Sequence, residues 1–341
     1  MKHKLSILPA FLSLCGLLSG CAGSVVPPDV ADAALAVQLY ARGGALEGTT
    51  TTTRTAPGEA FTASVAFTSA SGQYAPLTGM YEGVWTARVD ASGKIGWNTG
   101  GGIAAPVYPP DGAYLYLAAI APAATLQSGT ATYTLTGQQD LLYAVELRGC
   151  MWDGERFSGN TYAQNDRPLL FNHLLTRLHF KARKGQTANS DVQITRITVN
   201  EAKTQAAVPL ATGVPSFSGS AGMSLVPSDG SVTGTTPIDL GSLMLPPAVD
   251  GDAYTLTVET SAGTYSHVKI AYDNGASGNL QAGMSHEVTL NISYNEPKPD
   301  PDPDPGTDPD PGTTPLTITV AVGEWTVVEA GDLEIEEKNK E

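Results

Sequence analysis

Short runs in which apolar residues occupy every second position recur along the chain and restrict it to β-structure. Clear examples are residues 61–67, 113–117, 253–258 and 286–292. Successive side chains of a strand point to opposite faces of its sheet, so each run predicts a strand with one buried face. The turns between them favour positive φ: Pro110-Asp111-Gly112, Ser228-Asp229-Gly230, Val249-Asp250-Gly251 and Asp273-Asn274-Gly275. Regularly spaced short strands of this kind predict an all-β sandwich or barrel.

One stretch, residues 169–185, fits either a helix or a strand. The spacing of Phe171, Leu174 and Leu178 suits a helix, but from Leu174 onward the residues alternate. One face would carry Leu174, Thr176, Leu178, Phe180 and Ala182, and the other Leu175, Arg177, His179, Lys181 and Arg183. We favour a strand with a core face and a mostly basic, solvated face. The polar loop 154–168 before it is the predicted junction between two β-domains.

The first 20 residues have the features of an export signal. Lys2, His3 and Lys4 precede an apolar run from Leu5 to Leu18, which is shorter than the about 20 residues needed to span a bilayer. The run ends in Leu18-Ser19-Gly20-Cys21, which resembles a bacterial lipobox with Cys21 as the lipidated residue. The alternative is an ordinary signal peptide followed by a chance cysteine. Multiple acyl chains on Cys21 would anchor the protein stably to a membrane.

Cysteine content and charge exclude several classes of protein. Cys15 lies within the signal and Cys21 is the predicted lipid site, so Cys150 has no partner for an intrachain disulfide. The fold must therefore be stabilised by core burial or by partners. The formal net charge is −15, and residues 296–341 alone contain 13 acidic and 3 basic residues. The sequence has no basic stripe to neutralise phosphates, so we do not expect a nucleic-acid partner.

An alternating strand is predicted near each end of the chain. Near the N-terminus, residues 35–41 place Leu35, Val37 and Leu39 on one face. A polar, Gly- and Thr-rich stretch containing Arg42 and Arg54 follows, and such stretches are where proteases cut. Near the C-terminus, the apolar positions are Leu316, Ile318, Val320 and Val322. The phase reverses after Gly323, so Trp325 has the other parity, and this indicates a bulge or bend.

The C-terminal strand follows a proline–aspartate spacer at residues 299–315. Proline at every second position keeps such a spacer in polyproline II, with a reach of roughly 50 Å, far more than a hairpin needs. Burial of the four apolar side chains of the strand would contribute roughly 6–12 kcal/mol as an upper bound. The strand will therefore not stay free in water. Either it folds back on its own domain as an edge strand, or it completes the sheet of another molecule.

These features together resemble the fimbrillin family, the type V pilins of Bacteroidota. The resemblance extends over most of the chain. It includes the lipobox, the strand ahead of Thr53-Arg54-Thr55-Ala56, residues 114–122, Asp140-Leu141-Leu142-Tyr143-Ala144, Leu170-Phe171-Asn172-His173-Leu174-Leu175-Thr176-Arg177-Leu178, Leu225-Val226-Pro227, residues 280–286 and the terminal strand with Trp325. The order and spacing of these pieces make the resemblance specific, although no single piece is diagnostic.

The resemblance implies two transthyretin-like β-sandwich domains in tandem with a C-terminal extension strand. The expected boundaries are a signal peptide at 1–20, a lipidated segment with a removable strand at 21–54, sandwiches at 55–165 and 166–296, a linker at 297–315 and a donor strand and tail at 316–341.

It also implies a structural pilin of the outer membrane and cell surface that is exported as a lipoprotein through Cys21 and supports adhesion. An arginine-specific protease would cut after Arg54, with Arg42 as the weaker candidate, and expel strand 35–41. The C-terminal strand of another pilin subunit, carrying Leu316, Ile318, Val320, Val322 and Trp325, would then fill the groove. The long acidic spacer and the absence of acidic residues directly after Cys21 depart from the family pattern. The donor strand favours a shaft subunit, although tip and anchor roles stay open.

The sequence contains no motif that argues for catalysis, a cofactor or a metal. HExxH, GxSxG, Walker and CxxC patterns are missing. His173 and His179 on one strand would lie about 20 Å apart, too far to share a metal. Asp300, Asp302 and Asp304 are followed by Pro305, where a calcium loop of the EF-hand type needs glycine.

One alternative function remains, in which the protein is a monomeric surface lipoprotein that binds glycans. Trp85, Trp97, Trp152 and Tyr108 would form its aromatic stacking platform.

Overall fold

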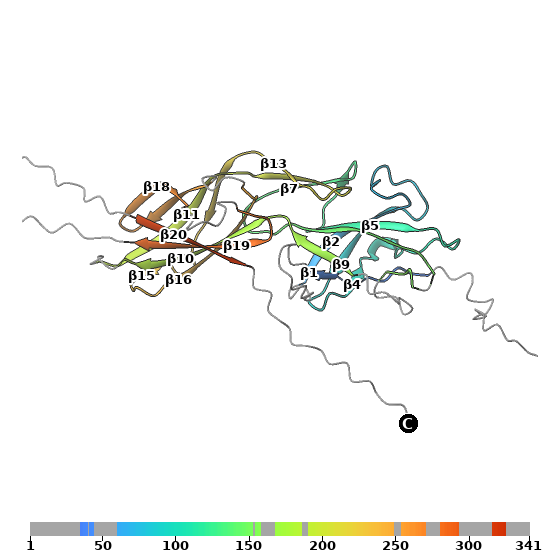
Figure 1. The fold of residues 1–341 in the computed structure, drawn as a ribbon, viewed down its shortest axis with the longest axis horizontal. Coiled ribbons are helices and arrows are strands. Elements are labelled where there is room, and N and C mark those ends of the chain that lie inside the picture. Colours follow the sequence, from blue (N-terminus) through green and yellow to red (C-terminus); the bar gives the residue numbers. More distant parts are fainter. Residues whose placement is uncertain are drawn as a thin grey trace, which may run out of the picture. The chain divides into compact units, whose positions relative to one another are not determined.

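The computed structural model confirms the predicted all-β fold (Figure 1). It describes residues 35–39, 41–43, 60–152, 154–157, 168–185, 190–248, 254–270, 280–292 and 316–324. Within these ranges, the short 3-10 helix η2 (Gly100–Gly102) is the single helical element, and the other regular elements are strands.

The largest sheet has seven strands, and it contains most of the first half of the described chain. Its order is β1 (Ala41–Gly43), β9 (Leu169–His173), β8 (Leu142–Gly149), β5 (Leu115–Ala121), β2 (Phe61–Thr68), β3 (Gly83–Val89) and β4 (Ile95–Trp97). The pair β1–β9 is parallel and the other pairs are antiparallel. Strand β9 thus extends this sheet beyond residue 165, where the sequence places a domain boundary. The division into two domains stays a prediction.

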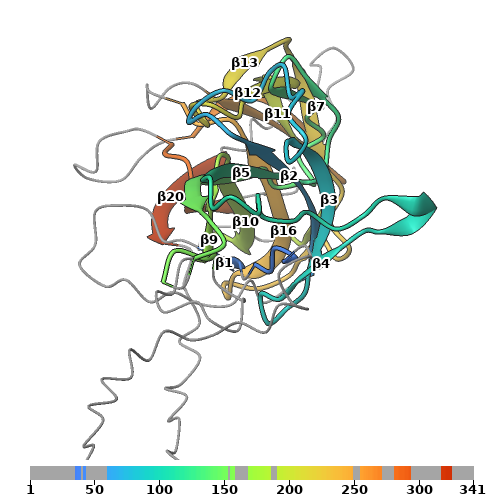
Figure 2. The same ribbon diagram turned by 90° about the vertical axis from the view of Figure 1, so that its right-hand side faces the viewer.

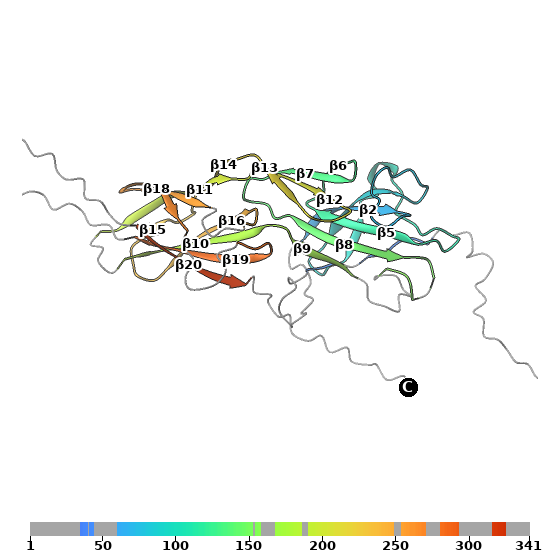
Figure 3. The same ribbon diagram turned by 45° about the horizontal axis from the view of Figure 1, so that its top comes forward.

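Three smaller sheets contain the remaining strands (Figures 1 and 3). The first has the order β16 (Ile238–Leu245), β10 (Thr176–Lys184), β19 (Met284–Ile292) and β20 (Leu316–Glu324). The second has the order β14 (Ala221–Leu225), β11 (Val192–Ala202), β17 (Thr255–Thr260) and β18 (Gly263–Lys269), with β15 (Ser231–Val232) also paired to β11. The third has the order β13 (Ser216–Ser218), β12 (Gln205–Pro209), β7 (Thr130–Thr134) and β6 (Leu126–Gln127). The pair β7–β12 joins strands from both halves of the chain.

Strand β10 confirms the strand interpretation of the ambiguous stretch. Its buried residues are Thr176, Leu178, Phe180 and Ala182, and the basic residues alternate with them on the more exposed face. The strand begins only at Thr176, so His173 lies in β9 and His179 in β10. The expectation that both histidines belong to one strand is therefore wrong, because the chain leaves one sheet and enters another at Leu174-Leu175.

Two clusters of buried side chains pack against the strands, and we call them the N-terminal core and the C-terminal core. The N-terminal core comprises Val37, Leu39, Ala63, Val65, Phe67, Ala87, Val89, Ile95, Tyr108, Leu115, Leu117, Ala119, Ala121, Ala144, Phe157, Leu169 and Phe171. The C-terminal core centres on β10, β11, β16, β17 and β19, and it also includes Ala66, Ala118 and Ile120. Alternate residues of β2 and β5 therefore belong to different cores, which explains why both strands are buried on both faces.

Gly112 and Gly230 lie in two of the predicted turns, and each position needs glycine for a different reason. Gly112 adopts the expected positive φ of 79°. Gly230 does not, so that expectation is wrong. A Cβ atom at Gly230 would lie 2.0 Å from the carbonyl oxygen of Ile194, and glycine is needed there for close backbone approach.

Phe67 is the aromatic centre of the N-terminal core, and its truncation should strongly destabilise the protein. Its ring centroid lies 5.3 Å from that of Trp85, 5.9 Å from Trp97 and 6.4 Å from Phe157. Phe67→Ala should lower the free energy of unfolding by about 3–5 kcal/mol, since buried contacts are lost and a cavity is left. Val145→Ala, at a side chain that is 57% exposed, should change it by less than about 0.5 kcal/mol. Urea unfolding followed by tryptophan fluorescence measures both, and equal losses would contradict the assignment.

Candidate functional site

The candidate site is the place where the N-terminal segment, residues 35–39 with β1 after it, meets the N-terminal core. Val37 is 0% exposed and Leu39 is 2% exposed, whereas Ala36 and Gln38 are exposed. This confirms the predicted alternation, with Leu35 partly buried on the same face. Full burial of one valine and one leucine contributes about 3–6 kcal/mol. The segment is therefore part of the core and not a loose leader.

Hydrogen bonds hold the segment from two sides. On one side, the Val37 N–H donates to the Pro106 carbonyl (2.8 Å) and the Leu35 carbonyl accepts from Tyr108 N–H (3.0 Å). On the other side, the Leu39 carbonyl accepts from the backbone N–H of Ile95 in β4 (3.3 Å). The Val37 carbonyl accepts from the indole Nε1–H of Trp97 (2.8 Å). Four hydrogen bonds thus hold the backbone of Leu35, Val37 and Leu39.

The segment also joins the two ends of the seven-stranded sheet (Figure 2). Leu39 bonds to β4, which is one outer strand of the sheet. Two residues later, Ala41 begins β1, which pairs with β9 at the opposite end. Both ends of the sheet contribute to the N-terminal core, Ile95 from one and Leu169 from the other. The N-terminal segment therefore closes the sheet around its core.

The aromatic residues proposed for a glycan platform pack mainly into this core. Tyr108 is buried and stacks on Phe157 with ring centroids 5.8 Å apart, and burial raises its pKa above the ordinary range. Trp85 and Trp97 pack against Phe67, and their indole N–H groups donate to the carbonyls of Ala104 and Val37. Trp152 is exposed. The four side chains do not form one exposed platform.

The C-terminal strand β20 pairs with the neighbouring strand of its own chain. It lies antiparallel to β19 at the outer position of its sheet, over the whole range from Leu316↔Ile292 to Glu324↔Met284. The register places its four predicted apolar positions opposite the four buried residues of β19: Leu316 opposite Ile292, Ile318 opposite Leu290, Val320 opposite Val288 and Val322 opposite His286. The structure thus contains the fold-back arrangement, one of the two that the sequence leaves open.

His286 is an unusual member of the C-terminal sheet. Its side chain is 1% exposed, and it lies on the same face of β19 as Val288 and Leu290. Among the residues that the structure describes, neither ring nitrogen has a hydrogen-bond partner. Burial lowers the pKa of His286 below its usual 6.5, because a charged ring would be poorly solvated. The folded state therefore favours the neutral form of His286, which pairs with Val322 in the ladder.

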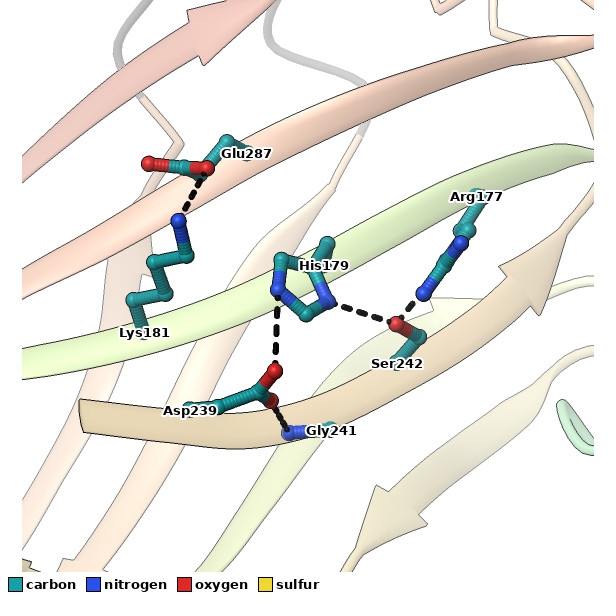
Figure 4. A network of polar contacts seen from close by, with 7 residues as sticks. All are labelled: Arg177, His179, Lys181, Asp239, Gly241, Ser242 and Glu287. Atoms are coloured by element: carbon teal, nitrogen blue, oxygen red, sulfur yellow. Dashed lines mark hydrogen bonds and ion pairs between the residues drawn. The ribbon is translucent and has the colours of Figure 1, made fainter. Parts of the chain in front are cut away.

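A polar network covers the other face of this sheet (Figure 4). Arg177 Nε donates to Ser242 Oγ (3.0 Å), and His179 contacts Ser242 Oγ through Nδ1 (2.9 Å) and Asp239 through Nε2 (3.4 Å). Lys181 forms an ion pair with Glu287 (2.6 Å). Burial lowers the pKa of His179, and the Asp239 carboxylate partly opposes this shift.

Although serine, histidine and aspartate meet here, we assign the network a structural role. The serine hydroxyl accepts from a permanently charged guanidinium, and the side chains link three adjacent strands. No group of three or more metal-ligating side chains occurs in the described part of the chain. In the same residues, no helix has the length and apolar character needed to cross a membrane.

Comparison with known proteins identifies the family. A model of the family described as fimbrillin-like matches residues 86–325, which is more than half of the chain. The chain belongs to the fimbrillin-like family. This confirms the resemblance seen in the sequence. A search of the curated proteins finds no match.

Solved structures share the fold of this fimbrillin-like chain. A candidate cell adhesion protein from Bacteroides ovatus has a TM-score of 0.54 at 16% identity, covering 86% of this chain and 99% of that one. A second, from Bacteroides uniformis, has a TM-score of 0.52 at 14% identity, covering 85% and 99%. At such low identity the likeness shows the fold alone.

Several predicted site residues of the fimbrillin-like chain lie outside the described residues, namely Cys21, Arg54 and Trp325. Arg42 lies inside β1, paired with Leu170. The structure places the two terminal strands in different sheets, so one chain does not bring the predicted expelled and donor strands together. Sequence reasoning missed the buried His286, although its alternation with Val288 and Leu290 is a signal that could have revealed it.

The buried His286 predicts a specific loss of stability in acid. Because its pKa is lower in the folded than in the unfolded state, its neutral form favours folding above pH 6.5. As the pH falls below 6.5 this contribution is lost, by at most about 1.4 kcal/mol per pH unit, until the folded-state pKa is passed. His286→Leu should reduce the slope of unfolding free energy against pH between 7 and 5, measured by urea titration. Val226→Ala, at an exposed side chain that does not titrate, should keep the wild-type slope. Unchanged slope in His286→Leu would contradict the assignment.

Proposed function

We propose that this fimbrillin-like chain is a structural fimbrial subunit that polymerises by strand exchange after proteolysis. The observation that carries the proposal is the insertion of the N-terminal segment. The segment buries Val37 and Leu39 and closes the seven-stranded sheet, yet it precedes the rest of that sheet in the chain. One cut between the segment and β2 is therefore enough to separate it from the fold.

Loss of the segment would leave a groove with a defined chemistry. The positions of Val37 and Leu39 would expose apolar atoms of the N-terminal core. The N–H groups of Ile95 and Tyr108, the carbonyl of Pro106 and the indole N–H of Trp97 would lose their partners. Such a groove accepts an extended strand with apolar residues at every second position, as in recognition by strand addition. Residues 316–322 have this pattern.

The position of β20 supports its role as the donor. It is an outer strand that pairs with β19 alone among the described strands, and the segment 297–315 joins it to the fold. Moving β20 to another subunit exposes one edge of β19, and filling the open core of that subunit offsets this cost. The reach of the proline–aspartate spacer, roughly 50 Å if extended, suits a neighbouring molecule better than a local hairpin.

The structure also supports Arg54 over Arg42 as the cleavage point. Arg42 lies in a strand that is paired with β9, and a protease must bind its substrate in an unpaired extended form. Arg54 follows the Gly- and Thr-rich stretch, of the type in which limited proteolysis concentrates.

Export as a lipoprotein through Cys21, and display at the outer membrane and cell surface, complete the proposal. Family membership supports a fimbrial subunit, and the described solved structures from cell adhesion proteins support a role in adhesion. Its expected partners are other pilin subunits and an arginine-specific protease. Neither catalysis nor a cofactor enters the proposal. Tyr108 is buried and Trp85 and Trp97 are partly buried against the N-terminal core, which argues against the glycan alternative.

The proposal predicts polymerisation on cleavage. The purified chain treated with an arginine-specific protease should form ladders that resist mild SDS, detected by gel electrophoresis. Arg54→Ala, with Arg42 kept, should leave the chain monomeric. Persistent monomers after clean removal of residues up to Arg54 would refute the proposal.

The second prediction concerns the donor. A chain that ends at Asn295 should be cut normally but should form no SDS-resistant ladder, because it has no strand to donate. Full-strength assembly of this truncated form would show that another surface joins the subunits.

A further inference from the structure

The side chain of Trp97 makes a hydrogen bond that would ordinarily come from the backbone of a strand. The Ile95 N–H of β4 donates to the Leu39 carbonyl of the N-terminal segment. An antiparallel ladder continued from this bond by two residues would place Trp97 opposite Val37. At this point β4 ends, and the indole Nε1–H of Trp97 supplies the donor to the Val37 carbonyl at 2.8 Å. The other side of β4 pairs with β3 through Ala87.

This donor is held in a fixed place. The indole ring packs on Phe67 with centroids 5.9 Å apart and an interplanar angle of 58°. Phe67 is fully buried and also contacts Trp85 and Phe157, so the Trp97 ring rests on a rigid base. A carbonyl that is buried beside Val37 without a donor is strongly unfavourable. Any strand that occupies this place must therefore direct a carbonyl at the indole.

A fixed donor sets the place of one backbone carbonyl of the strand that enters the core. Successive residues of a strand have the same backbone geometry but opposite side-chain directions, so a slip of one residue still presents a carbonyl to the indole and reverses every side chain. Residues 316–322 have apolar side chains on one parity and Thr317, Thr319 and Ala321 on the other. The indole therefore fixes where the backbone of the strand lies, and the apolar set of side chains selects the face that is buried.

We propose that Trp97 is a positioning residue for strand exchange between two copies of this chain. Its indole N–H holds the Val37 carbonyl before cleavage, and after cleavage it holds a backbone carbonyl of the incoming C-terminal strand. The inference rests on the proposed function for its second half only, since the first half concerns the intact chain.

The test compares Trp97→Phe with Trp85→Phe in the full-length, uncut chain. Both substitutions keep an aromatic ring beside Phe67 and remove one indole donor, but the Trp85 donor goes to Ala104 (2.9 Å) and not to the segment. Amide hydrogen exchange of Val37 and Tyr108 should be about 5- to 100-fold faster in Trp97→Phe, as expected for a buried carbonyl left without its donor. In Trp85→Phe, the amides of Val37 and Tyr108 should exchange at close to the wild-type rate. Equal rates in the two variants would overturn the inference.

A measurement on the unsubstituted protein covers the case in which Trp97→Phe does not fold. The indole proton of Trp97 should be protected from exchange in the uncut chain and should lose this protection when the segment is removed. The indole proton of Trp85 should not change. An unprotected Trp97 indole in the uncut chain would overturn the inference.

The stability of the polymers tests whether the Trp97 indole also holds a carbonyl of the incoming C-terminal strand. Ladders formed from cut Trp97→Phe chains should dissociate in SDS about 5- to 100-fold faster than those from Trp85→Phe chains. Equal dissociation, with the exchange difference present in the uncut chain, would show that the incoming strand does not use the indole. If unsubstituted cut chains form no ladder, the proposed function fails, and hydrogen exchange still decides whether Trp97 holds the segment.

Discussion

The burial of Val37 and Leu39 is the interaction on which the first half of this protein depends. A sheet of seven strands has two outer edges, and here one short segment bonds to β4 and then pairs with β9. The two side chains fill the space that these edges enclose. Because one segment supplies both the apolar contacts and the link between the edges, its loss would open the core and the sheet together. The fold is closed while the segment is in place, and the segment is joined to the rest of the sheet by a single stretch of chain.

The two terminal strands are attached in different ways, and the difference suits their proposed roles. The N-terminal segment lies deep, with partners on both flanks and no exposed atoms at Val37. Strand β20 lies at an edge and pairs on one flank with β19. A deeply buried segment needs a covalent cut before it can leave, whereas an edge strand can detach through loss of one ladder. In the proposed mechanism, the irreversible step would therefore take place at the N-terminal segment and the reversible step at β20.

The alternation of apolar residues in the sequence predicted where strands lie and which of their faces are buried. The alternation of residues 286–292 and 316–322 located β19 and β20, and the basic face of β10 followed from residues 176–183. Patterns of this kind do not encode which strands pair. The placement of β9 beside β8, and of β7 beside β12, results from packing between distant residues.

The candidate site was predictable to a similar extent. Leu35, Val37 and Leu39 were assigned to one face from alternation alone, and Val37 and Leu39 are buried as expected. The role of Trp97 could not be predicted, because an indole N–H that replaces a backbone donor leaves no periodic pattern in the sequence. Cys21 and Arg54 stay predictions from motif and composition.

The parallel pair β10–β19 affects how this protein folds. It joins Arg177 to Ser285 and Lys184 to Ile292, residues that are more than a hundred positions apart. Non-local pairing of this kind is slow, because the intervening chain must be ordered before the contact forms. Until Met284 and its successors arrive, β10 has only β16 beside it. The sheet that contains β20 can therefore be completed only after residues 284–292 have been synthesised and have returned to β10.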